Sequence, residues 1–209
     1  MIAFRKIFAD PSFYALILLN IFFIYEYKDD PKNYSTIIWV FWCQSVLIGI
    51  FNFLELLTTR TVNPKGFTMN DKPVDPEKSR GCYSFFFLFH YEVFHLVYFF
   101  FLVVQLGAKS IDVSFLKYAL LALTANLIIA FIRRTQEYKI HTPNLGTMFF
   151  LPYLRIIPMH FMILIPAFLN LKPALVFLIL KGIFDVVGHV IATRWYWVKE
   201  EQKPIESFV

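Results

Sequence analysis

Long apolar runs dominate this sequence and constrain its fold more than any other feature. A helix needs about 20 largely apolar residues to cross a bilayer, because the hydrocarbon core is about 30 Å thick. Hydrophobic residues make up 58% of the chain and charged residues 17%, whereas soluble domains have about 45–50% and about 25%. These values exclude an ordinary soluble enzyme, a disordered chain and a nucleic-acid-binding module.

The sequence predicts an all-α polytopic membrane protein that forms a bundle of six transmembrane helices. We expect a single transmembrane domain over residues 1–209, with a cytoplasmic loop over residues 58–81 between the second and third spans. Pro11 should lie at the start of the first span, and Asp112 should cap the fourth. The expected spans cover about residues 12–25, 35–57, 83–106, 113–132, 146–171 and 173–197.

Basic residues in the loops predict the orientation, since cytoplasmic loops carry an excess of Lys and Arg. With a cytoplasmic N-terminus, 13 of the 20 Lys and Arg residues fall on the cytoplasmic side and five on the other side. Both termini should therefore be cytoplasmic, in a multi-pass protein of the inner or plasma membrane. The expected partners are membrane lipids, a lipid or small-molecule substrate and further copies of the chain, but no nucleic acid.

The sixth span carries the sharpest polar pattern. Lys181, Asp185 and His189 are spaced i, i+4, i+8, which places them on one face of a helix. Ionisable residues within a bilayer are costly and are functional candidates by default. Asp185 and His189 could bind one metal ion or form an acid–base pair. The alternative is a polar seam that only pairs with neighbouring helices.

The fifth span combines three prolines with Arg155 and His160. The prolines should break or kink the helix and free backbone carbonyls. Arg155 cannot lose its charge, so it requires a carboxylate, a cage of carbonyls or a bound anion. The carboxylates available to it are those of Glu55, Glu92 and Asp185.

Two histidines and a carboxylate fall within six residues of the third span, as His90, Glu92 and His95. They indicate either a site or hydrogen-bonded core residues. In the second span, polar side chains should share one stripe that ends at Glu55, and interhelical hydrogen bonds explain them as well as a site does. The fourth span is expected to be mostly structural.

The histidines of the third, fifth and sixth spans are predicted to lie at similar depths. At about 1.5 Å per residue, four of them and one aspartate fall between about 10 and 21 Å from the cytoplasmic ends of their helices. Imidazole and carboxylate ligands suit zinc and other first-row divalent metals. We therefore predict one intramembrane divalent-metal site, with zinc the expected ion, formed by His90, His95, His160, Asp185 and His189.

Such a site predicts a metal-dependent hydrolase that acts on a lipid or small substrate from the cytoplasmic side. A catalytic zinc lowers the pKa of its bound water to about 7. Asp185 would be a ligand, an orienting partner of His189 or the general base. Arg155 would hold an anionic substrate group or stabilise a developing oxyanion.

The same residues are compatible with two other functions. They could form the path of a metal-ion or proton-coupled transporter, although the outer halves of the spans contain few polar residues. They could instead lock the bundle of a structural or assembly subunit.

Three short motifs resemble an uncharacterised family of bacterial and archaeal integral membrane proteins, a domain of unknown function. The resemblance covers most of the chain and favours the histidines and the aspartate of these motifs over His95. The family has Gly where this chain has Glu92, so the resemblance gives that carboxylate no role, and it implies no established activity. The motifs are Phe89-His90-Tyr91, Pro158-Met159-His160 and Lys181…Asp185…His189.

In its chemistry, the predicted metal site is similar to the intramembrane zinc hydrolases of the alkaline ceramidase and progestin/adiponectin receptor type. In those proteins, histidines and an aspartate from several helices bind zinc. They have seven helices and a paired-histidine motif in the last one, where this chain has Asp185 and His189. The likeness therefore concerns the ligand set rather than the sequence.

Overall fold

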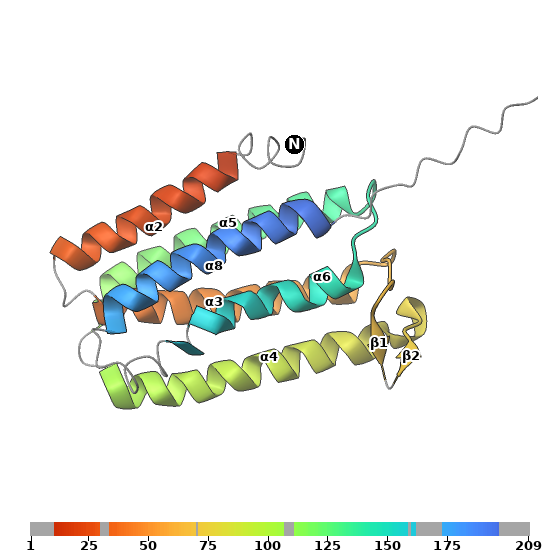
Figure 1. Cartoon of the computed structure of the whole chain (residues 1–209), viewed down its shortest axis with the longest axis horizontal. Helices are drawn as coiled ribbons and strands as arrows, with labels where there is room; N and C mark the ends of the chain where they lie inside the picture. The colour runs from red at the N-terminus through yellow and green to blue at the C-terminus, as the bar shows by residue number, and fades with distance from the viewer. Residues whose placement is uncertain are drawn as a thin grey trace, which may run out of the picture.

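The computed structural model describes residues 11–29, 34–69, 71–106, 111–158, 160–161 and 173–196. This part of the chain is a bundle of long helices that run side by side (Figure 1). A short antiparallel hairpin of β1 (Thr68–Met69) and β2 (Lys72–Pro73) lies between the second and third long helices. The helices are α2 (Pro11–Asp29), α3 (Tyr34–Thr58), α4 (Pro76–Leu106), α5 (Val113–Glu137), α6 (Leu145–Phe150), the 3-10 helix η2 (Leu151–Arg155) and α8 (Pro173–Trp195).

Three helices of the described part are long and apolar enough to cross a membrane, over Ser35–Thr58, Pro76–Val104 and Val113–Glu137. They confirm a helical membrane protein and coincide with the second, third and fourth expected spans. Helices α2 and α8 occupy the places of the first and sixth expected spans. The fifth expected span starts with α6 and turns into η2 around Pro152, while residues 162–172 lie outside the described residues.

Capping side chains explain where the helices begin. The Asp112 carboxylate accepts the N–H of Phe115 at 3.0 Å, so this residue caps α5 as predicted. Helix α4 starts at Pro76 rather than near residue 83, because Asp75 accepts the N–H groups of Glu77 and Lys78 at 3.1 and 3.3 Å. The first turns of α4 are charged, and the loop before it is shorter than expected.

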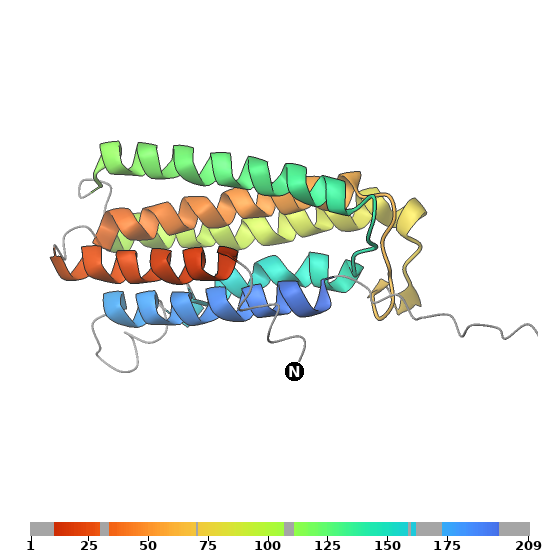
Figure 2. The same ribbon diagram turned by 90° about the horizontal axis from the view of Figure 1, so that it is seen from above.

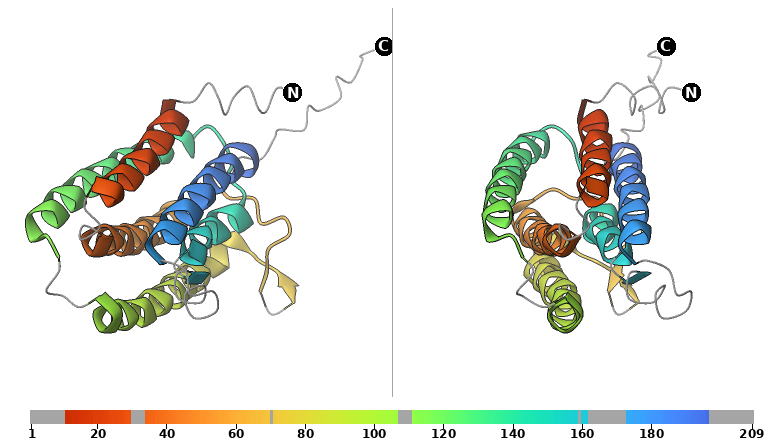
Figure 3. Two further views of the ribbon diagram at one scale, coloured as in Figure 1. Left: turned by 60° about the vertical axis from the view of Figure 1, so that its left-hand side comes forward. Right: turned by 90° about the vertical axis from the view of Figure 1, so that its left-hand side faces the viewer.

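Helix α3 is the centre of the bundle. It packs against α4, α5, α6 and η2, while α2 packs against α8, which in turn packs against η2. Figure 2 shows the helices from above, and the end-on view of Figure 3 shows α5 standing apart from α8, with α4 on another side of α3. The third and sixth helices of the predicted bundle, α4 and α8, are therefore not neighbours.

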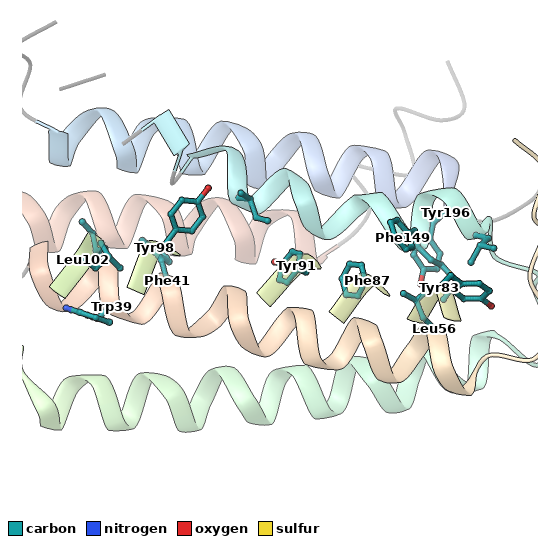
Figure 4. Close-up of a cluster of buried hydrophobic side chains, with 14 of the residues drawn as sticks. Trp39, Phe41, Leu56, Tyr83, Phe87, Tyr91, Tyr98, Leu102, Phe149 and Tyr196 are labelled. Carbon is teal, nitrogen blue, oxygen red and sulfur yellow. The ribbon is translucent and has the colours of Figure 1, made fainter. Parts of the chain in front are cut away.

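A row of buried side chains on α4 forms the core against α3 and α6 (Figure 4). Its members recur at helical spacing and are at most 2% exposed, whereas the opposite face of α4 exposes phenylalanines such as Phe89 and Phe100. Within a bilayer the outside of a helix contacts lipid rather than water, so this exposed apolar face is suited to lipid contact. The buried row is Tyr83, Phe87, Tyr91, Tyr98 and Leu102.

Candidate functional site

A cavity of about 610 Å³ lies between α3, α5, η2 and α8. Its walls combine apolar side chains with the amides of Gln44, Asn52 and Asn126. Charged side chains reach it from three helices, which is unusual inside a membrane bundle, where each such group is costly. The charged residues and the histidine at its surface are Glu55, Arg133, Arg134, Lys181, Asp185 and His189.

The predicted stripe of α8 lies on this cavity. The Lys181 ammonium forms an ion pair with Asp185 Oδ2 at 2.6 Å, and each side chain is 8% exposed. Asn20 of α2 completes the pair, since its Oδ1 accepts from Lys181 at 2.9 Å and its Nδ2 donates to Asp185 Oδ2 at 3.3 Å. The ammonium also lies 4.3 Å from the centre of the Phe41 ring. His189 lines the same cavity, one turn beyond Asp185.

A second charged cluster lies at the other end of the cavity and is centred on Glu55, which is 3% exposed. Arg134 donates from Nη1 to both carboxylate oxygens, at 3.1 and 3.2 Å. The hydroxyls of Tyr138 and Tyr196 donate to Oε2 at 2.8 and 3.2 Å and contact each other. Burial raises the pKa of the Tyr138 phenol, which lies just beyond the end of α5, so it remains a donor at neutral pH. Glu55 therefore connects three helices.

His95 is held in a different place, between α3 and α4. Its Nδ1 lies 2.9 Å from the Tyr91 carbonyl and its Nε2 lies 2.8 Å from Ser45 Oγ. A carbonyl can only accept, so Nδ1 carries the proton and Nε2 accepts from the serine hydroxyl. Because both ring nitrogens have partners and the side chain is 1% exposed, His95 acts as a hydrogen-bonded core residue.

His90 and His160 pair with tyrosines. His90 Nδ1 lies 2.8 Å from the Tyr153 hydroxyl, and the His90 ring stacks on Phe86. His160 Nδ1 contacts the Tyr98 hydroxyl. Both histidines are exposed on the surface of the bundle.

The structure does not bring the five predicted metal ligands together. Among the described residues, no three His, Cys, Asp or Glu side chains are placed so that they could hold a metal ion. Asp185 and His189 line the cavity, whereas His90, His95 and His160 bond to side chains or backbone elsewhere. The predicted ligands on α4 and α8 were expected at similar depths but do not contact one another, because α3, α6 and η2 lie between these two helices (Figure 3). The five predicted ligands therefore do not form one group, and only Asp185 and His189 share a location, on the cavity.

The other predicted groups are also separated. The side chain of Arg155, predicted to act in catalysis, lies outside the part of the chain that the structure describes. Glu55 bonds to Arg134 of α5, and Glu92 lies beside Gly49 of α3. Neither carboxylate joins the histidines in a metal-binding group.

Sequence reasoning missed four residues that shape the cavity and its two ion pairs. Asn20 was visible as a lone amide in an otherwise apolar span, and Asn126 as one of two polar residues in its span. Tyr138 and Tyr196 carried no usable signal, since aromatic residues near helix ends also suit the membrane interface. Only the folded chain shows that both reach Glu55.

Comparison with known proteins gives a family without an activity. No curated protein and no solved structure matches the chain. Residues 4–202 match the model of a family of unknown function, DUF6498. This match is consistent with the uncharacterised family suggested by the short motifs, and since it covers nearly the whole sequence, the chain belongs to the family DUF6498.

Proposed function

We propose that this protein is a proton-coupled carrier that binds a small polar solute in the cavity between α3, α5, η2 and α8. The observation that carries the proposal is the group of ionisable side chains around this cavity, of which Glu55, Lys181, Asp185 and His189 fall within expected spans. Such residues within a membrane mark substrate, ion or proton paths, because an idle charge there is costly. The volume of about 610 Å³ is within the range of about 300–1,000 Å³ for small-molecule pockets.

The carrier proposal includes six spans with both termini in the cytoplasm of a cell. Three helices meet the length and composition of a span. Helix α2 has 19 residues and α8 has 23, or about 28 and 34 Å at 1.5 Å per residue. Bilayer lipids then surround the exposed apolar faces, and further copies of the chain are candidate neighbours there.

The polar groups at the deep end of the cavity favour a carrier over a site open on one side. Lys181 lies about 12 Å from the outer end of α8 in this topology, and it bonds to Asn20 of α2. Polar contacts thus continue into the outer half, where the sequence had suggested few. Lys181 and Asp185 form an ion pair at this depth, and paired charges within a membrane mark ion and proton paths.

Cysteine accessibility tests the proposal without knowledge of the solute. In a background with Cys43→Ser and Cys82→Ser, Asn126→Cys places a thiol on the cavity. Ile128→Cys is the matched control, because Ile128 is exposed on the same helix but does not line the cavity. A membrane-impermeant methanethiosulfonate is added to inside-out and right-side-out vesicles.

A carrier exposes its cavity alternately to both sides. We therefore expect Asn126→Cys to react from both sides at least about ten times faster than Ile128→Cys. Reaction from one side only, or no difference between the two variants, would overturn the carrier proposal.

A metal-dependent hydrolase is the second candidate, favoured by the common position of Asp185 and His189 on the cavity. The protein would be purified without chelator and its metals measured by mass spectrometry. About one zinc per chain, lost in His189→Ala but kept in His141→Ala, would support this function. No stoichiometric metal in the wild-type protein would contradict it.

A further inference from the structure

Helix α5 presents two adjacent arginines to the cavity and no carboxylate. Asn126, Ala130, Arg133 and Arg134 line it at spacings that follow one helical face. This helix has no buried residue and packs chiefly on α3. Asn126 and Arg133 therefore lie at the cavity wall, while Arg134 also bonds to Glu55 of α3.

The charges around the cavity do not cancel. Lys181 is paired with Asp185, and Arg134 is paired with Glu55 through Nη1. The Nε and Nη2 groups of Arg134 make no hydrogen bond to any other residue that the structure describes, and the Arg134 side chain is 40% exposed. Arg133 is exposed and has neither a hydrogen bond nor an ion pair within the described residues. Among the described residues that line the cavity, three fixed cations thus face two carboxylates, and guanidinium donors remain available.

We infer that the cavity binds a phosphoryl group that carries an apolar substituent, with Arg133 and Arg134 as its ligands. Guanidinium groups present paired N–H donors that match phosphate oxygens. The apolar walls, including Ile48, Phe51 and Phe184, are suited to the rest of the ligand. This inference rests on the proposed function, because it names the solute class of the same cavity.

The same chemistry is found in a soluble alkyl phosphate and in the head group of an anionic phospholipid. The first probe is hexyl phosphate, with hexanol as its uncharged counterpart, titrated calorimetrically into protein in phosphatidylcholine nanodiscs. The second probe is phosphatidic acid, compared with phosphatidylcholine as bound lipid in native mass spectrometry. Preference for the first probe indicates a soluble solute, and preference for the second indicates a lipid.

Arg133→Gln is the informative variant, because Arg133 is exposed and its loss breaks no contact in the described structure. Arg60→Gln removes another exposed arginine at the same end of the bundle and is the matched control. We expect Arg133→Gln to weaken binding of the preferred probe at least about tenfold and Arg60→Gln to change it less than about twofold. Arg133→Lys should bind with intermediate affinity, because it keeps the charge but not the paired donors.

Equal weakening by Arg133→Gln and Arg60→Gln would overturn the inference, since it would indicate attraction to surface charge alone. The inference would also be overturned if hexyl phosphate bound no better than hexanol and phosphatidic acid bound no better than phosphatidylcholine. These failures differ from failure of the carrier proposal. If Asn126→Cys reacts from both sides but neither phosphoryl probe binds, the carrier proposal stands and the phosphoryl site fails. If a phosphoryl probe binds but Asn126→Cys reacts from one side only, the phosphoryl site stands and the carrier proposal fails.

Discussion

Glu55→Gln should destabilise the bundle more than any other single neutralisation at the end where α3, α5 and α8 finish. The Glu55 side chain is 4% exposed and is the common acceptor for Arg134, Tyr138 and Tyr196. The glutamine is similar in size and keeps one oxygen for the tyrosines. It removes the charge that balances the guanidinium and places an N–H₂ group among donors.

The expected loss can be estimated from the geometry of the ion pair. Removal of one partner from a buried ion pair costs about 3–5 kcal/mol, because the other charge is left uncompensated. Arg134 is 40% exposed, so water can solvate part of its guanidinium and the cost falls to the lower end. We expect a loss of about 3 kcal/mol in the free energy of unfolding.

The assay is reversible unfolding by sodium dodecyl sulfate in mixed micelles, followed by tryptophan fluorescence. Glu137→Gln is the matched control, since Glu137 is exposed near the same end of α5 and should change stability by less than about 0.5 kcal/mol. Arg134→Met in addition to Glu55→Gln should recover part of the loss, because the stranded charge is gone. If Glu55→Gln and Glu137→Gln unfold at the same detergent fraction, the charged cluster does not stabilise the bundle.

Three further changes test the packing and the caps. Gly49→Ala should cost about 1–3 kcal/mol by overpacking, because its Cβ would lie 2.5 Å from a buried tyrosine ring. Gly81→Ala, with nothing within 4 Å, should be neutral or stabilising in the same unfolding assay. Ser45→Ala should cost about 1–3 kcal/mol, because a buried histidine nitrogen loses its donor. Ser84→Ala should cost nothing, since the Ser84 hydroxyl has no partner within the described residues, and equal losses for the two serines would refute this account. The backbone N–H groups that Asp75 accepts lower its pKa, so its cap is present at neutral pH and is lost as pH falls through that lowered pKa. Hydrogen exchange should show the first turn of α4 losing protection on acidification in the wild type but not in Asp75→Asn.

Much of the fold follows from local sequence signals. Apolar length predicted the helices of α3, α4 and α5, and the cap at Asp112 and the change of helix type near Pro152 follow from side-chain and proline chemistry. The start of α4 was predicted too late, because apolar length alone ignores turns that extend beyond the bilayer. The cap at Asp75 carried the missing signal.

The candidate site was predictable only in part. The spacing of Lys181, Asp185 and His189 correctly placed three side chains on one helix face, which the structure finds on one cavity. The predicted meeting of these residues with His95 required α8 to neighbour α4. Hydropathy fixes depth but carries no information on which helices touch, so the lateral order of the bundle could not be derived.

Ser45 and Glu55, which were predicted to share one stripe of α3, lie in two different environments. Ser45 and Gly49 face α4, where they contact His95 and Tyr91. Gln44 and Glu55, three helical turns apart, face the cavity with α5 and α8. Positions 44 and 45 are separated by about 100° around the helix axis, so these adjacent residues face different neighbours. The central position of α3 thereby separates the hydrogen bonds that hold α3 to α4 from the charges available to a ligand. Changes at Ser45 or Gly49 should therefore alter the packing of α3 on α4 without changing a residue of the cavity, whereas Glu55 serves both the cavity and the stability of the bundle.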